Sequence, residues 1–336
     1  MKRGLGLLLI LGTVLFLSCG VHAQTDAHGR AEWMREARWG VMTHYLPRWI
    51  AEATNEPMTP QRWNTLVDAI DVEQLADQLQ EVGAGYFIVS LGQSDGYYLA
   101  PNATYDRFVG AQPSKCSRRD LVFELAEALE KRGIKLIVYL MSRAPRRDAE
   151  ATAALSYEHP PGRNREFLLK WEAVIREWSE RWGNKVAGWW FDSVYWPNAM
   201  HRHPEPPNFA SFAAAARAGN PQSALAFNPG VVNRPISMDP EDDYIAGEVS
   251  DPTQWRLNPS SLNGYSDGAQ IHVLTYLGRS WGHGPPRFDR GEEIEFSRRV
   301  REAQGVITWD VPARLDGTLD PEFLPALRAI GAALTP

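Results

Sequence analysis

The chain has 336 residues, a length that allows one large domain or two of ordinary size. Hydrophobic residues make up 44 % of it and charged residues 23 %, which excludes a disordered chain, a collagen-like repeat and a multi-span membrane protein. The formal net charge is −6, from 35 basic and 41 acidic residues, and this argues against a nucleic-acid partner. The 13 Trp, 11 Tyr and 12 Phe residues suit sugar faces, but they also fill large cores.

Residues 1–23 have the parts of an export signal. A basic pair at the start precedes an almost wholly apolar run over residues 5–17, and Ala23 ends a small-residue cleavage site. The run is too short to cross a bilayer comfortably, so no transmembrane span is expected. We therefore expect cleavage after Ala23 and an exported domain, periplasmic or extracellular, over residues 24–336. A lipoprotein anchored through Cys19 is the alternative.

Short apolar runs then alternate with amphipathic stretches, which is typical of strand–helix units around a parallel sheet. Eight runs are predicted to be strands, at residues 38–45, 86–91, 134–141, 186–194, 224–228, 244–249, 271–277 and 305–311. Apolar residues at helical spacing predict helices between them, over 72–82, between 120 and 133, around 167–178, and over 292–304 and 320–334.

Eight strands with intervening helices in about 300 residues predict an α/β fold, a single-domain (β/α)8 barrel of the TIM type. An open doubly wound sheet is the competing topology. No G-x-G-x-x-G follows any predicted strand, which removes the commonest use of that second fold. In a (β/α)8 barrel the chemistry lies at the C-terminal ends of the strands.

Polar residues lie on several of the predicted strands or follow them, most of them at the C-terminal ends. They are His44, Gln93, Ser94, Asp95, Asp192, Asn228, Glu248, His272 and His283. Asp192 comes directly after a run of aromatic residues, and a carboxylate in such surroundings is either hydrogen-bonded or reactive. It can attack an anomeric carbon as a nucleophile, or it can simply cap the next element. Glu248 is the second carboxylate, and retaining hydrolysis needs such a partner about 5–5.5 Å from the nucleophile.

Several segments, in order along the chain, resemble glycoside hydrolase family 29, the α-L-fucosidases. The likeness covers nearly all of residues 31–334. The segments that carry it are residues 33–44 (WMREARWGVMTH), 83–97, 119–122, 136–142, 190–192 (WFD), 227–228 (FN), 280–283 (SWGH) and 310–317 (DVPARLDG).

The resemblance implies an exported retaining enzyme that needs no metal and no cofactor. It implies that Asp192 is the nucleophile and that His44 binds a sugar hydroxyl. The acidic run at residues 239–243 lacks the spacing of a calcium loop, so no metal site is predicted there either. The remaining residues expected to bind the substrate are Gln93, Ser94, Asp95, Tyr97, Trp190, Asn228, Trp281 and His283.

Three features depart from the family pattern. Gln93 and Ser94 stand where the family has paired histidines that bind fucose hydroxyls. The sugar that this protein recognises can therefore differ from fucose. His272 stands where the family has its acid/base glutamate, so the acid/base is either Glu248 or His272; a histidine can donate a proton near neutral pH. The β-sandwich that commonly follows the family's barrel is not expected, because the sequence stops at Pro336.

The predicted function is hydrolysis, with retention, of terminal α-L-fucosyl or related residues in an oligosaccharide or glycoconjugate. One alternative is a retaining glycosidase for another sugar, such as an α-L-galactoside. The other is an inactive barrel that only binds carbohydrate. The sequence predicts no oligomeric state.

Overall fold

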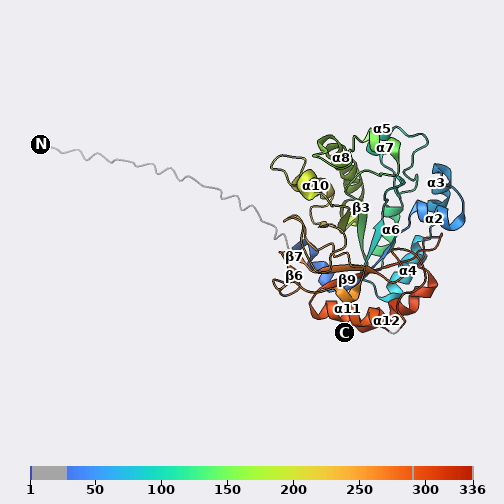
Figure 1. Ribbon diagram of the computed structural model, residues 1–336, viewed down its shortest axis with the longest axis vertical. Coiled ribbons are helices and arrows are strands. Elements are labelled where there is room, and N and C mark those ends of the chain that lie inside the picture. The colour runs from blue at the N-terminus through green and yellow to red at the C-terminus, as the bar shows by residue number, and fades with distance from the viewer. Residues whose placement is uncertain (2–28, 290, 335–336) are drawn as a thin grey trace.

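The computed structural model describes Met1 and residues 29–289 and 291–334 (Figure 1). The predicted export signal, with Cys19 and the cleavage site at Ala23, lies outside the described residues and stays a prediction. Among the described residues, no helix is both long and apolar enough to cross a membrane.

Seven parallel strands form the central sheet, in the order β5-β4-β3-β2-β1-β9-β8. Their apolar runs are buried along almost their whole length, as expected for strands covered on both faces. The strands are β1 (Trp39–Thr43), β2 (Tyr86–Ser90), β3 (Lys135–Met141), β4 (Gly188–Asp192), β5 (Ala224–Phe227), β8 (His272–Tyr276) and β9 (Val306–Val311).

Residues 244–249 take the place of the eighth strand, between β5 and β8. On the β8 side they make parallel bridges, Tyr244 with Gln270 and Glu248 with Leu274. The prediction of a single (β/α)8-type domain is therefore confirmed. The predicted strand at residues 244–249 is wrong, because this segment forms only isolated bridges and the sheet has seven strands in the described part of the chain.

Two carboxylates explain why the ladder between β5 and this segment is irregular. Asp243 Oδ2 accepts a hydrogen bond from the backbone N–H of Leu225 at 2.9 Å, and Asp242 Oδ1 accepts one from that of Phe227 at 2.7 Å. Side chains thus satisfy the β5 amides that a neighbouring strand would otherwise bond. These aspartates belong to the acidic run 239–243, and that run therefore has a structural role.

Helices cover the outside of the sheet, and half of those described begin where a side chain caps them. Asp71, Asn102, Asp120 and Asp148 each accept a bond from an N–H in the first turn of a helix. The helices are α1 (Glu32–Ala37), α2 (Pro47–Thr54), α3 (Pro60–Asp68), α4 (Val72–Val82), α5 (Ala103–Val109), α6 (Leu121–Glu130), α7 (Ala149–Ala154), α8 (Arg165–Trp182), α9 (Pro197–Met200), α10 (Phe209–Ala216), α11 (Glu292–Glu302) and α12 (Leu324–Leu334).

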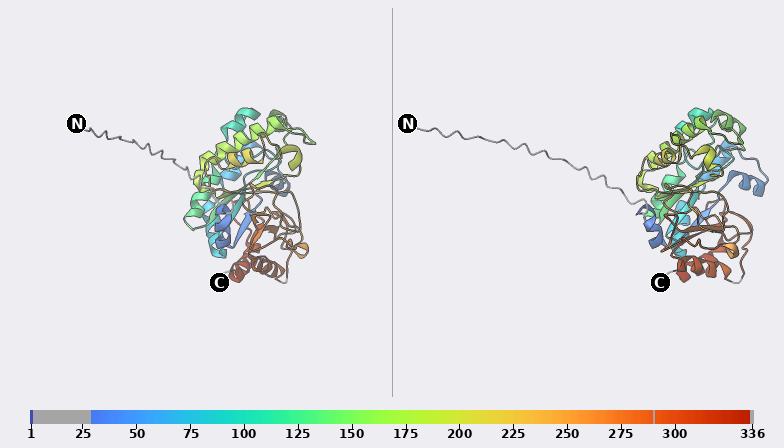
Figure 2. Two further views of the ribbon diagram at one scale, coloured as in Figure 1. Left: turned by 90° about the vertical axis from the view of Figure 1, so that its left-hand side faces the viewer. Right: turned by 60° about the vertical axis from the view of Figure 1, so that its left-hand side comes forward.

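The helical layer is incomplete on one side. Between β5 and β8 the chain forms only the short 3-10 turn η3 (Pro252–Gln254) and the hairpin of β6 (Tyr265–Ser266) and β7 (Ala269–Gln270). Loops drawn in brown and orange therefore form this side of the molecule, while α8 and α10 lie at one end and α11 and α12 at the other (Figures 1 and 2). After β9 the described residues form only the turn η4 (Pro321–Phe323) and α12, with no β-sandwich.

The buried side chains separate into two clusters. The larger lies between sheet and helices, and the smaller fills the inside of the curled sheet with residues such as Met42, Ile88, Tyr139 and Trp190. Because side chains alternate along a strand, each strand contributes to both clusters. The inner cluster ends near the C-terminal strand ends, where the cavity described next begins.

Candidate active site

A small cavity opens at the C-terminal ends of the strands, where chemistry is expected in this fold. Its volume is about 130 Å³. It is lined by His44, Trp49, Gln93, Tyr139, Trp190, Asp192, Glu248, Leu274 and Trp281. Of the residues predicted from sequence, the cavity thus brings together His44, Gln93, Trp190, Asp192, Glu248 and Trp281.

One amide nitrogen bridges the two carboxylates of the cavity. Asn228 Nδ2 donates to Asp192 Oδ1 at 3.0 Å and to Glu248 Oε2 at 2.7 Å. The two oxygens therefore lie no farther apart than these two distances combined. Asn228 is fully buried, and its own Oδ1 accepts from the N–H of Gly230 at 3.0 Å, which fixes the orientation of the amide.

Asp192 has further hydrogen-bond donors. Its Oδ1 accepts from the backbone N–H of Ser193 at 2.6 Å, and its Oδ2 accepts from the Tyr139 hydroxyl at 2.5 Å. Gln93 Nε2 donates to the same hydroxyl at 3.0 Å, and the Tyr139 ring stacks on Trp190 with 5.3 Å between centroids. These donors hold the Asp192 carboxylate in one orientation.

Glu248 is in a different electrostatic environment. Desolvation by burial, together with the nearby negative charge of Asp192, raises the pKa of Glu248 from 4.5 to about 7. The Asn228 hydrogen bond and the charge of His44 act in the opposite direction, but more weakly. Glu248 is thus suited to donate a proton near neutral pH, beside a second carboxyl group.

His44 forms a buried pair with a residue on the last strand. Its Nδ1 lies 2.8 Å from Asp310 Oδ1, and Asp310 Oδ2 also accepts from the backbone N–H of Gly282. Burial by itself would lower the pKa of His44, but Asp310, helped by the more distant charges of Asp192 and Glu248, raises it overall. Asp310 therefore connects β1, through His44, to the loop that carries Trp281.

His272 does not reach the cavity. Its side chain is fully buried inside the sheet, with Nδ1 3.0 Å from the Ile245 carbonyl oxygen and Nε2 2.8 Å from Thr308 Oγ1. Burial lowers the pKa of His272 to about 4. A ring with both nitrogens hydrogen-bonded and no access to solvent cannot protonate a leaving group. The prediction that His272 could be the acid is therefore wrong.

Other predicted residues lie around the cavity without lining it. The Ser94 carbonyl accepts from the N–H of Arg147, Asp95 lies 4.0 Å from the Arg147 guanidinium, and the Tyr97 hydroxyl donates to the Met58 carbonyl. His283 is exposed, with its ring 4.9 Å from that of Trp49. From residues 93–97 only Gln93 lines the cavity.

Three residues of the lining and one supporting residue were not predicted from the sequence. Tyr139 was assigned only to a strand, and Trp49 and Leu274 were not singled out. The alternation of strand residues carries a usable signal for Tyr139, since it is the last inward-facing ring before the end of β3. Asp310 begins the segment 310–317 that carries the family resemblance, but it was not predicted to be the partner of His44.

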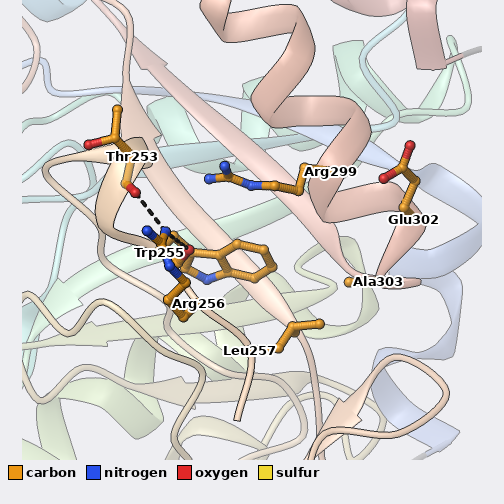
Figure 3. Close-up of a pocket in the computed structure, with 7 residues that line it drawn as sticks. All are labelled: Thr253, Trp255, Arg256, Leu257, Arg299, Glu302 and Ala303. Carbon is orange, nitrogen blue, oxygen red and sulfur yellow. Dashed lines mark hydrogen bonds between the residues drawn. The ribbon is translucent and has the colours of Figure 1, made fainter. Parts of the chain in front are cut away.

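Larger grooves lie elsewhere on the surface. Figure 3 shows one of about 640 Å³, between α11 and the loop that contains Trp255. Its charged side chains are Arg256, Arg299 and Glu302, so it offers no pair of facing carboxylates. Within the described residues, no cluster of three or more His, Cys, Asp or Glu side chains is suited to hold a metal ion.

Solved structures with this fold include glycoside hydrolases. An endo-fucoidan hydrolase from glycoside hydrolase family 107 is 21 % identical with a TM-score of 0.67, over 90 % of this chain and 53 % of the other. This chain therefore spans about half the length of that protein. An α-L-fucosidase of glycoside hydrolase family 29 from Bacteroides thetaiotaomicron is 17 % identical with a TM-score of 0.58, over 90 % and 73 % of the two chains.

The α-L-fucosidase from Lactobacillus casei, solved with its α-L-fucose product, is 15 % identical with a TM-score of 0.60. That match covers 90 % of this chain and 97 % of the other. No curated protein matches the sequence. The alpha-L-fucosidase family matches residues 20–335, which is nearly the whole chain. The chain therefore belongs to the alpha-L-fucosidase family of glycoside hydrolases.

Proposed function

We propose that this family member is a retaining, exo-acting α-L-fucosidase in which Asp192 is the nucleophile and Glu248 the acid/base. The observation that carries the proposal is the amide of Asn228, which bonds an oxygen of each carboxylate at 3.0 and 2.7 Å. This bridge sets an upper limit on the distance between the two bonded oxygens, and the limit agrees with the roughly 5–5.5 Å between the carboxyl groups of retaining enzymes. It is too short for the roughly 6.5–9.5 Å of inverting ones, which must fit a water molecule between the carboxyl groups.

The first step forms a covalent intermediate. An Asp192 oxygen attacks C1 of the sugar, the bond from C1 to the leaving oxygen breaks, and Glu248 gives its proton to that oxygen. The raised pKa of Glu248, about 7, keeps a proton available for this step at neutral pH. The hydrogen bonds from Tyr139, Ser193 and Asn228 hold Asp192 for attack.

The second step releases the sugar. Glu248, now ionised, takes a proton from a water molecule whose oxygen attacks C1 and displaces Asp192. The product keeps the α configuration, and both side chains return to their starting protonation states. His44, with its raised pKa, lies in the same cavity and is suited to donate a hydrogen bond to a sugar hydroxyl.

The size of the cavity supports action on chain ends. Its volume of about 130 Å³ lies well below the roughly 300–1,000 Å³ of pockets that hold drug-sized ligands. The rings of Trp49, Trp190 and Trp281 form its walls. A space of this size suits one terminal sugar ring, whereas an endo-acting enzyme needs a groove open at both ends.

Gln93 is the reason to test an α-L-galactoside as an alternative substrate. Its amide reaches into the cavity and donates to Tyr139, at a position where the family has a histidine. An α-L-galactoside, which differs from an α-L-fucoside by a hydroxyl group on the C5 substituent, therefore belongs in the substrate test beside the fucoside.

The test is turnover of aryl α-L-fucoside and aryl α-L-galactoside, with the first-formed anomer identified by proton NMR. We expect faster release from the fucoside, α-L-fucose as the first product, and loss of turnover in Asp192→Ala. Faster turnover of the galactoside would favour the second sugar. β-L-Fucose as the first product would contradict retention, and saccharide binding without any product would favour the inactive barrel.

We also propose that the protein is exported, from the pattern of residues 1–23 alone. Determination of the mature N-terminus tests this. Soluble export predicts a chain that begins at Gln24, whereas a lipid-modified Cys19 would support the lipoprotein alternative.

A further inference from the structure

Arg143 lies beside the catalytic pair, two residues after β3 ends. The register of β3 and β4 pairs Met141 with Asp192, and the N–H of Ser142 donates to the Asp192 carbonyl at 2.8 Å. Arg143 therefore stands at the same rim of the barrel as Asp192, but outside the cavity lining.

The charge of Arg143 has no counter-ion in the described part of the chain. It forms no ion pair there, and its buried Nε has no hydrogen-bond partner. Arg146, three residues on, is exposed and likewise makes no ion pair with any described residue. Both charges act on the exposed His159, whose pKa is lowered by desolvation and by Arg146 and Arg143. In a chain of net charge −6, two uncompensated arginines beside an active site need an explanation.

Tyr195 connects Arg143 to the catalytic carboxylates. The Arg143 guanidinium carbon lies 5.4 Å from the centroid of the Tyr195 ring. The same ring lies close to Gly230, where an added Cβ would lie 3.2 Å from Tyr195 Cε1. The turn that contains Gly230 also holds Asn228, which bridges Asp192 and Glu248.

Arg143 and Tyr195 therefore lie beside the site, and Arg146 acts together with Arg143 on His159. Tyr195 is 43 % exposed, whereas the rings that enclose the cavity are largely buried. A sugar seated in the cavity would point its leaving group out of it, and the ring of Tyr195 offers an apolar surface for that group to cover. Arg143 and Arg146 would then face substituents of the leaving group rather than the sugar that is cleaved off.

We infer that Arg143 and Arg146 form a leaving-group subsite for a substrate that carries an anionic substituent, a sulfate ester or a carboxylate. This inference rests on the proposed function. A guanidinium binds both groups through paired N–H donors, and the unpartnered Nε of Arg143 provides one of these. The neighbouring aspartate and glutamate are negatively charged in part of the catalytic cycle, and the arginines offset their repulsion of an anionic substrate.

The experiment compares aryl α-L-fucosides in matched pairs. The 4-sulfonatophenyl and 4-sulfamoylphenyl fucosides differ in charge but are similar in size, as are the 4-carboxyphenyl and 4-carbamoylphenyl fucosides. We expect kcat/KM to favour the charged member of at least one pair by about fivefold or more. The pair with the larger preference distinguishes sulfate from carboxylate. The preference should decline as salt is added, since exposed charges are screened.

Variants assign the preference to these side chains. In Arg143→Gln and in Arg146→Gln the charged-to-neutral ratio of kcat/KM should fall toward one, and Arg143→Lys should restore part of it. Arg328→Gln, on the remote helix α12, removes an exposed arginine and should keep the ratio of the wild-type protein. A ratio near one in the wild-type protein, or an unchanged ratio in both Gln variants, would overturn the inference alone. Absence of turnover on all four fucosides would contradict the proposed function, and the inference with it.

Discussion

Asn228 sets the geometry of the site at the scale of single residues. A neutral amide can donate to two anions without becoming an anion itself. The hydrogen bond that Asn228 Oδ1 accepts from the Gly230 N–H keeps the Nδ2 group facing them. Asp192 and Glu248 are therefore held together although their charges repel. The repulsion contributes to the raised pKa of Glu248, after desolvation, so the same geometry that brings the carboxyl groups together also separates their roles.

Replacement of Glu248, the proposed acid/base, should change the pH profile. With a pKa of about 7, Glu248 should give kcat/KM an alkaline limb near that pH. Glu248→Gln should remove the limb and lower kcat by about 10²–10⁴ for substrates with poor leaving groups. The loss should be much smaller for a 2,4-dinitrophenyl fucoside, whose leaving group departs without a proton. Glu295→Gln, on the exposed face of α11, is the matched control, and persistence of the limb in Glu248→Gln would contradict the assignment.

The pair of His44 and Asp310 allows a second test. Since Asp310 is the strongest factor that raises the pKa of His44, Asp310→Asn should lower that pKa, measured by NMR titration of the ring. A raised folded-state pKa stabilises the protein below the unfolded value of 6.5, and this contribution is lost as pH rises through the folded value. Asp310→Asn should therefore reduce the free energy of unfolding more at pH well below 6.5 than well above it. The opposite order would show that the pair is not charged in the native state.

At the scale of elements, Asp242 and Asp243 complete the barrel where the backbone ladder fails. Asp243 accepts from Leu225 and also pairs with two arginines, at 2.7 Å to Arg217 and 3.3 Å to Arg30. Its carboxylate is almost fully buried, so the interactions gain strength from their low-dielectric surroundings. This arrangement positions residues 244–249, and with them Glu248.

Asp243→Ala should accordingly destabilise the fold. Removal of one partner of a buried ion pair leaves uncompensated charges and an unbonded amide, which typically costs about 3–5 kcal/mol. Urea denaturation followed by circular dichroism measures the change. Glu295→Ala, in an exposed pair with Arg298, is the comparison and should change the free energy of unfolding by less than about 1 kcal/mol. Equal effects of the two substitutions would contradict a structural role for Asp243.

The elements were largely predictable from sequence, because hydrophobic periodicity is local information. Helices over 72–82 and 292–304 and the strand over 86–91 were placed within two residues of their observed bounds. The closure at residues 244–249 was not predictable as such, because it depends on which side chains replace a missing ladder. His272 was wrongly expected in the cavity. The position of a residue along a strand indicates only approximately how deep its side chain lies. One pleat decides whether the side chain faces the cavity or the core beneath it.

At the scale of the whole molecule, ionisation of buried carboxyl groups lowers the free energy of unfolding. Burial raises the pKa values of Glu248 and Asp242 to about 7, so each binds a proton more tightly in the folded state than in the unfolded chain. For such groups the free energy of unfolding falls as pH rises from the unfolded pKa to the folded one. The protein should thus lose stability between about pH 4.5 and pH 7.

Glu248→Gln separates the contribution of the catalytic carboxyl from that of Asp242. The variant should be more stable than the wild-type protein above pH 7, and its stability should change less between pH 4.5 and 7. Urea denaturation across this range is the measurement. A variant that is inactive yet more stable also shows that its loss of activity is not a loss of fold. A parallel pH dependence in the two proteins would contradict the raised pKa.

The central claim, that Asp192 forms a bond to the sugar while Glu248 moves the proton, is tested most directly by trapping the intermediate. The Glu248→Gln protein is incubated with 2-deoxy-2-fluoro-α-L-fucosyl fluoride, and the intact protein and its peptides are weighed by mass spectrometry. The account predicts one added fluorofucosyl group, on the peptide that contains Asp192, and none in Asp192→Ala. A label on a different residue, or α-fucoside hydrolysis that persists in Asp192→Ala, would contradict it.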